Sequence, residues 1–165
     1  MADIRDGPPG RIFRRDPIAD MRATGTETCL SRLFTRMADA CQGAGAYDEA
    51  SAALDSAANV METHDERYME AEIHRHRGEL ALLRGEESDS AEARFRQAIE
   101  VARRQEAKSL ELRATMSLAR LWRKQGRQDE ARTRLAAVYE EFTEGFATPD
   151  LTDARELLQS LTSSG

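Results

Sequence analysis

The feature that most constrains the fold is a phrase that the chain repeats. QGAGAYDEA, at residues 42–50, and KQGRQDEA, at residues 124–131, have nearly the same order of residue types, and LRGEESDSA at 83–91 is a looser third copy. The glycines of the three copies, Gly45, Gly85 and Gly126, are separated by 40 and 41 residues. A fixed spacing of this size is typical of repeat proteins, in which each unit buries its apolar face against its neighbours. The phrase therefore predicts a stack of equivalent units.

Each unit is predicted to be a pair of helices. Apolar residues recur at helical spacing over six segments, at about 26–41, 47–61, 66–83, 91–102, 109–122 and 131–142. Thr24, with Glu27 three residues later, resembles a capping box at the start of the first. The repeated glycines are expected to end the first, third and fifth helices, because glycine tolerates the left-handed conformation that turns one helix back on the next. TPDLTDARELL, with Thr148 as N-cap and Pro149 at the first helical position, predicts a seventh helix.

Residues at fixed offsets from the glycines predict where the helices cross. Seven positions before them stand the small residues Ala38, Gly78 and Ala119. Nine or ten positions after them stand the large residues Leu54, Phe95 and Leu135. Small side chains allow two helix backbones to approach closely, and a large one fills the gap beside them.

This order of a small residue, a turn glycine, an alanine and a large apolar residue resembles the tetratricopeptide repeat (TPR), most closely in GAYDEASAALDSA and GRQDEARTRLAAV. The resemblance implies an all-α, TPR-like α-solenoid over 26–162, with three antiparallel helix pairs at about 30–64, 70–105 and 111–145 and a capping helix at 149–162. Residues 1–25 are expected to be an irregular extension, since they hold three of the four prolines. The period exceeds the usual length of about 34 residues, so we expect longer helices than the standard repeat has.

Longer runs resemble one bacterial group. EAEIHRHRGELALLRGE, AEARFRQAIEVARRQEAKSLELRATMSLARLWRKQGR and FTEGFATPDLTDARELL are similar to the C-terminal repeat region of large proteins that join a class III adenylate or guanylate cyclase, or another output domain, to an AAA-type ATPase. This resemblance spans residues 21–161 and implies a regulatory role in signalling. The catalytic parts do not carry over, because the chain has no G-x-x-x-x-G-K-[ST] phosphate loop and no strand pattern to hold the metal-binding aspartates of a cyclase.

Composition and charge argue against several classes of partner. The net charge of −6 disfavours nonspecific nucleic-acid binding. No apolar stretch approaches the roughly 18 residues of a membrane span, and the charged first twenty residues do not resemble a secretory signal. Cys29 and Cys41 fall within one predicted helix, about 18 Å apart along its axis, which is too far for a disulfide. We therefore expect reduced thiols and a cytoplasmic protein that contacts neither membrane nor nucleic acid.

No pattern in the sequence predicts catalysis. His74 and His76 lie near Glu72, but residues two apart on a helix point about 200° apart, so the two imidazoles cannot share one metal ion. Metal-binding helices instead use positions i and i+4. We interpret both histidines as part of a solvated helix face. No nucleophile has a base at a recognisable spacing, and we expect no enzyme activity, no metal and no cofactor.

The candidate functional site is the concave groove that the first helix of each pair lines in TPR proteins. The resemblance places twelve residues there, and three of them are Thr35, Glu72 and His76. The other nine are the candidate partner-binding residues: Arg32, Arg36, Asp39, Arg75, Glu79, Arg113, Met116, Arg120 and Arg123. The surplus of arginine favours an acidic strip or a carboxylate as ligand, because guanidinium groups pair bidentately with carboxylates. The alternative is that these arginines pair with Glu and Asp one turn away and only keep the helices soluble. Leu82, Leu83 and Met116 could supply an apolar floor for a bound helix or strand, but we expect Leu83 to belong to the core.

These observations predict a non-catalytic interaction module, a scaffold or a regulator, that binds a protein or peptide partner through the groove. Two alternatives remain at this point. The chain could be a detached C-terminal regulatory segment of a cyclase or of an ATPase-type signalling regulator. It could also be a structural module that forms homo-oligomers through the end of the helix stack.

Overall fold

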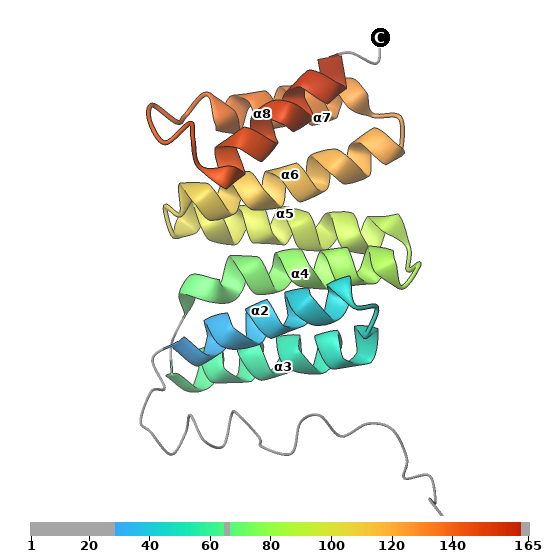
Figure 1. The fold of residues 1–165 in the computed structure, drawn as a ribbon, viewed down its shortest axis with the longest axis vertical. Coiled ribbons are helices and arrows are strands. Elements are labelled where there is room, and N and C mark those ends of the chain that lie inside the picture. Colours follow the sequence, from blue (N-terminus) through green and yellow to red (C-terminus); the bar gives the residue numbers. More distant parts are fainter. Residues whose placement is uncertain (1–28, 65–66, 163–165) are drawn as a thin grey trace, which may run out of the picture. The chain divides into compact units, whose positions relative to one another are not determined.

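The computed structural model describes residues 29–64 and 67–162. Contacts divide the chain into two units, Met1–Leu30 and Ser31–Gly165, and the helices described below lie in the second except for the first residue of α2. These described residues contain helices and no strand: α2 (Leu30–Gly43), α3 (Tyr47–His64), α4 (Glu70–Leu83), α5 (Ser88–Arg104), α6 (Lys108–Lys124), α7 (Gln128–Tyr139) and α8 (Pro149–Thr162), with a 3-10 turn, η2 (Arg67–Met69), before α4 (Figure 1). The expected all-α fold is confirmed.

The helices pack in the order in which the chain visits them. From α3 to α8 each helix contacts the next, and α4 also contacts α6, as α6 contacts α8 (Figure 1). In α2, Ala38 shares a buried cluster with Ala50 and Leu54 of α3. The side chain of Gln42, also in α2, donates a hydrogen bond to the backbone of α4. Helices α2, α4, α6 and α8 therefore form one row along the stack, and this row positions the candidate site.

The repeated glycines end α2, α4 and α6 with the same backbone motif. Gly45, Gly85 and Gly126 have φ angles of 75°, 74° and 78°. In each case the glycine N–H donates to the carbonyl three residues earlier, and the next N–H donates to the carbonyl five residues before it. This is the Schellman motif. A fourth copy ends α5, where the left-handed residue is Glu106 with φ of 54° and not a glycine.

Gly78 lies where α4 crosses α5. A Cβ atom added to Gly78 would lie 2.6 Å from Cε1 of Phe95, a ring that is fully buried. In the first and third pairs the same two positions hold Ala38 with Leu54 and Ala119 with Leu135, all buried. The larger ring of the second pair is thus accommodated by the smallest residue, and the close approach predicted at this position is confirmed.

Several local predictions were wrong or lie outside the described residues. Leu83 is 48% exposed and not part of the core, because it ends α4 at the edge of the stack. Phe142, expected in the sixth helix, lies beyond the end of α7 and packs half-buried against the core. The capping box at Thr24 and the extension over 1–25 lie outside the described residues. Cys29 and Cys41 are free thiols, and no helix in the described part of the chain is long and apolar enough to cross a membrane.

Candidate partner-binding groove

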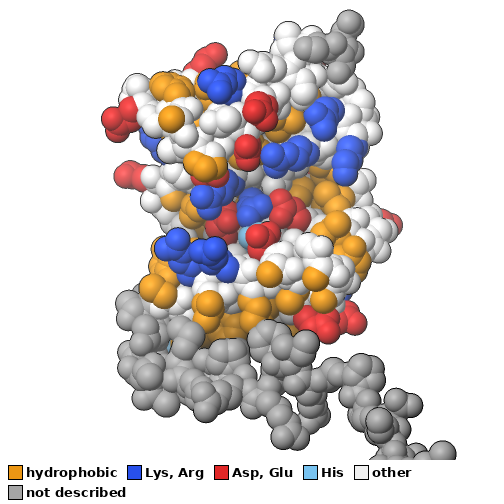
Figure 2. All heavy atoms as spheres, viewed as in Figure 1, with side chains coloured by type: hydrophobic (Ala, Val, Ile, Leu, Met, Phe, Trp, Pro, Cys, Tyr) orange, Lys and Arg blue, Asp and Glu red, His pale blue; other side chains and the backbone are white. Residues whose placement is uncertain are grey.

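A groove of about 610 Å³ runs along the row formed by α2, α4, α6 and α8. Figure 2 shows basic and acidic side chains gathered around this hollow. Seven of the nine predicted residues line it: Arg32, Arg36, Asp39, Arg75, Arg113, Met116 and Arg120. Of the other two, Glu79 lines a pocket that adjoins the groove, and Arg123 lines a third pocket beside α8. Arg120 lines all three.

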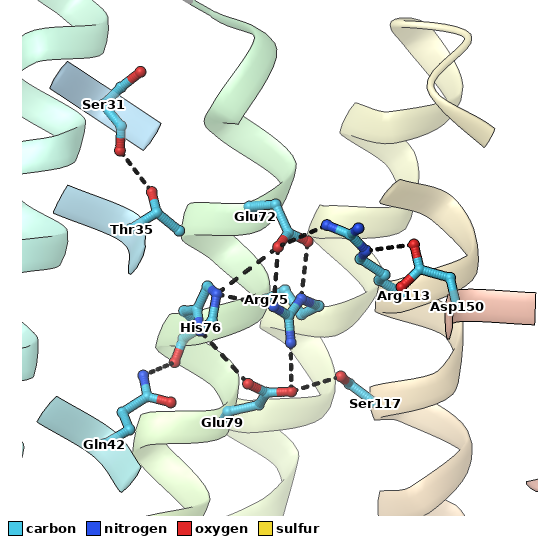
Figure 3. Close-up of polar contacts among 10 residues, drawn as sticks. All are labelled: Ser31, Thr35, Gln42, Glu72, Arg75, His76, Glu79, Arg113, Ser117 and Asp150. Atoms are coloured by element: carbon cyan, nitrogen blue, oxygen red, sulfur yellow. Dashed lines mark hydrogen bonds and ion pairs between the residues drawn. The ribbon is translucent and has the colours of Figure 1, made fainter. Parts of the chain in front are cut away.

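Arg75 is the centre of a polar network on the floor of the groove (Figure 3). Its Nε and Nη2 donate to the two carboxylate oxygens of Glu72, each at 2.9 Å, and its Nη1 donates to Glu79 at 2.7 Å. Burial opposes the charge of the guanidinium, but the hydrogen bonds and charges of Glu72 and Glu79 raise the pKa of Arg75 above its ordinary value. Arg75 is therefore committed to its neighbours on α4.

The network fixes the protonation state of His76. Nη2 of Arg75 lies 2.8 Å from Nε2 of His76. A guanidinium can only donate, so Nε2 must accept and the proton of the neutral ring is on Nδ1. That atom is buried without a hydrogen-bond partner in the described residues, and Oε2 of Glu79 lies 3.6 Å away. Burial first, and then the charge of Arg75, lower the pKa of His76.

The interpretation of the two histidines as a solvated face is therefore wrong. His76 is only 4% exposed, and His74 is half-buried. The covering groups come from other helices, which a reading of one helix does not include. Among the residues that the structure describes, no group of three or more His, Cys, Asp or Glu side chains is placed to hold a metal ion.

Three further contacts join the network to the other helices of the row (Figure 3). Gln42 of α2 donates to the backbone oxygen of His76 at 3.1 Å, and Ser117 of α6 donates to Glu79 at 2.8 Å. Arg113 of α6 donates to Asp150 of α8 at 2.8 Å. Gln42, Ser117 and Asp150 were not predicted as site residues. Ser117 follows Arg113 by one helical turn, so helical spacing alone could have placed it on the same face.

The charge of Glu72 depends on this network. Its side chain is only 7% exposed, and burial raises its pKa. The hydrogen bond and charge of Arg75, and then the charge of Arg113, outweigh burial and hold the pKa below its ordinary value. The carboxylate is therefore ionised at neutral pH although it lies in the floor of the groove.

Three arginines of the groove differ from Arg75 and Arg113. Arg32 and Arg36 of α2 and Arg120 of α6 are exposed and form no hydrogen bond or ion pair with any described residue. Asp39 and Asp153 line the groove in the same unpaired state. The alternative that arginines pair one turn away therefore holds for Arg75, while Arg113 pairs with a different helix. Arg32, Arg36 and Arg120 remain able to bind an added carboxylate.

The sequence matches no family model and no curated protein. The assignment of this groove as the candidate site therefore depends on its geometry and charge. Its floor is a network of hydrogen-bonded polar groups, in which Nδ1 of His76 lacks a partner among the described residues, and its walls carry guanidinium groups that are unpaired within the same residues. Such an arrangement can bind and orient an anionic group, since bidentate bonds between guanidinium and carboxylate combine charge with a fixed direction.

Proposed function

We propose that the chain is a non-catalytic interaction module, built as a TPR-like solenoid, that binds an acidic segment of a protein partner in the groove. The observation that carries this proposal is the presence of three arginines, Arg32, Arg36 and Arg120, that have no partner among the described residues and lie along a groove that the first helix of each pair lines. Guanidinium groups that lack an internal partner keep their full capacity for a ligand carboxylate.

The balance of charge in the groove supports an acidic ligand. Its lining holds five arginines and four acidic residues, in a chain whose net charge is −6. Arg75 is paired with Glu72 and Arg113 with Asp150. The remaining three arginines face only two unpaired carboxylates, Asp39 and Asp153. Among the described residues that line the groove, unpaired arginines thus outnumber unpaired carboxylates by three to two, which favours the approach of an anionic segment.

The TPR-like type and a regulatory setting are part of the same proposal. The Schellman motifs at Gly45, Gly85 and Gly126 recur once per helix pair, and α8 packs on the last pair as a cap would. We place the module in the cytoplasm, as an independent adaptor or as the regulatory segment of a signalling protein of the cyclase or ATPase type. In either setting the groove would recognise the partner and leave any catalysis to it.

The test is the binding of a fluorescein-labelled octaglutamate peptide, measured by fluorescence anisotropy. We expect Arg32→Gln combined with Arg36→Gln to weaken binding about tenfold, and Arg120→Gln to weaken it several-fold. Arg104→Gln, which changes an exposed arginine outside the groove, is the matched control and should have no effect. Arg75 is left unchanged because it supports the floor. Equal losses in the control and in the groove variants would show nonspecific charge attraction and refute the proposal.

Self-association is a second candidate, favoured by one observation on α2. Leu33 is 37% exposed, whereas the residues at the equivalent positions of α4 and α6, Ile73 and Ala114, are buried. Met37, one turn after Leu33, is also exposed. An apolar strip at one end of a helical stack is suited to contact with another copy. Light scattering over a concentration series tests this candidate, and a mass equal to one chain at every concentration would exclude it.

A further inference from the structure

A smaller pocket adjoins the groove where α4, α5 and α6 meet. It has a volume of about 300 Å³, and Leu82, Leu83, Phe95 and Leu121 contribute apolar side chains to it. Leu83 is the most exposed of these, at 48%. The pocket shares Arg120 with the groove, so one ligand could occupy both. We call it the Leu83 pocket.

Two cations, Arg120 and Lys124, and one carboxylate, Glu79, line the Leu83 pocket. Arg120 and Lys124 lie one turn apart on α6, are exposed, and form no hydrogen bond or ion pair with any residue that the structure describes. The acidic residue of the lining, Glu79, already accepts hydrogen bonds from Arg75 at 2.7 Å and from Ser117 at 2.8 Å. Both bonds end on Oε1 of Glu79, and Oε2 lies 3.6 Å from Nδ1 of His76. The pocket therefore offers apolar surface beside two cations that lack a partner among the described residues and one carboxylate that is bonded to the polar floor.

We infer that the Leu83 pocket binds one large apolar side chain of an acidic peptide segment, with Arg120 and Lys124 binding a carboxylate next to it in the peptide. This inference rests on the proposed function, because the remaining acidic residues of the same segment would lie along Arg36 and Arg32. It adds a specificity element to that function. Acidity alone would attract many segments, whereas a pocket for one aromatic or leucine side chain selects among them.

The physical basis of the inference is that burial of an apolar side chain and charge-assisted hydrogen bonds, each weak alone, act on neighbouring residues of one peptide. Leu82 and Leu83 supply the accessible apolar surface of the pocket, since Phe95 and Leu121 are buried. An aromatic side chain that packs against these two leucines removes apolar area from water. A carboxylate that lies between two cations gains charge-assisted hydrogen bonds that an exposed single cation would not provide. Neither cation has to give up an internal partner, so binding requires no rearrangement of the polar floor.

The experiment compares three labelled heptapeptides, EEEFEEE, EEEAEEE and KKKFKKK, on the whole chain by fluorescence anisotropy. We expect EEEFEEE to bind about tenfold more tightly than EEEAEEE, and KKKFKKK to bind too weakly to measure. Leu83→Gln should remove the advantage of phenylalanine while leaving the affinity for EEEAEEE unchanged. Leu33→Gln, a change of another exposed leucine, on α2, should preserve the advantage. Lys124→Gln should weaken both acidic peptides, and Arg104→Gln neither.

The outcomes separate this inference from the function on which it rests. If both acidic peptides bind equally and the groove variants weaken both, the proposed function stands and the Leu83 pocket has no role. If phenylalanine still improves binding in Leu83→Gln, the apolar side chain lies elsewhere and the inference is wrong. If neither acidic peptide binds, both proposals fail. Self-association that Leu83→Gln abolishes would identify a second copy of the chain as the occupant and overturn the assignment to a partner.

Discussion

The contact between Gly78 and Phe95 predicts that an ordinarily stabilising substitution should destabilise this protein. Glycine in the interior of a helix costs about 0.5–1 kcal/mol relative to alanine, so Gly78→Ala would be favourable if the site had room. The new Cβ atom, however, would lie 2.6 Å, 2.9 Å and 3.1 Å from three atoms of the Phe95 ring. Because that ring is fully buried, it cannot move away without disturbing its neighbours.

The magnitude follows from the two opposing terms. Overpacking a filled core costs about 1–3 kcal/mol, and the gain in helix propensity offsets up to about 1 kcal/mol of that. We therefore expect Gly78→Ala to lower the free energy of unfolding by about 1–2 kcal/mol. For a chain of this size the melting temperature should fall by about 2–4 °C per kcal/mol.

A double-mutant cycle with Phe95→Leu isolates the contact. That background restores the alanine–leucine combination found in the first and third helix pairs, so Gly78→Ala should there become neutral or stabilising by up to about 1 kcal/mol. Urea unfolding followed by far-UV circular dichroism gives all four free energies. The reasoning would be refuted by a Gly78→Ala variant more stable than the parent, or by an equal effect of the substitution in both backgrounds.

Three further predictions concern the polar floor and the turns. Arg75→Met should destabilise the fold by about 3 kcal/mol, because it leaves the buried Glu72 with only the longer ion pair to Arg113, at 3.8 Å. Adding Glu72→Gln should recover most of the loss in urea unfolding, and an unaffected single variant would contradict the burial of that charge. The pKa of His76 is lowered in the folded state, so the unfolded chain binds the proton more readily. The free energy of unfolding should therefore fall as the pH decreases below about 6.5, by at most about 1.4 kcal/mol per pH unit. Between pH 7.5 and 5.5, the free energy of unfolding should depend less steeply on pH in His76→Gln than in the parent. The pH dependence that persists in this variant is assigned to His74. An unchanged dependence would show that other groups bind the proton. Glu106→Gly should stabilise the fold by about 0.5 kcal/mol, since it relieves a left-handed φ of 54° in a residue with a side chain. Gly126→Ala should destabilise the fold by about 1 kcal/mol, and thermal unfolding measures both effects. An opposite order of stability would contradict the assignment of strain.

The sequence predicted the helices because their signals are local. The glycines that end α2, α4 and α6 and the proline that begins α8 act within one turn of the chain. The end of α5 carries no such signal, since its left-handed residue is Glu106. Leu83 was misassigned because helical spacing does not reveal whether a neighbouring helix covers the last turn.

The groove was predicted only in outline. The resemblance to the TPR indicated which residues face it, and most of them do line it. It could not identify which arginines are paired, because Arg113 finds its partner 37 residues away in Asp150. The same limit applies to His76, whose backbone is bound by Gln42, 34 residues earlier. Pairing and burial at this site are properties of neighbouring helices and not of any one segment.

The separations of these polar contacts have a consequence for how the chain could be rebuilt. Gln42 with His76, Glu79 with Ser117, and Arg113 with Asp150 are 34, 38 and 37 residues apart, close to one repeat, so each contact joins one helix pair to the next element of the row. The match of Gly78 to Phe95, by contrast, lies within a single pair. Exchanging the order of the pairs would therefore preserve their internal packing and lose the polar contacts between them. The apolar residues stabilise the packing within each helix pair, and the polar residues specify which pair lies next to it in the stack.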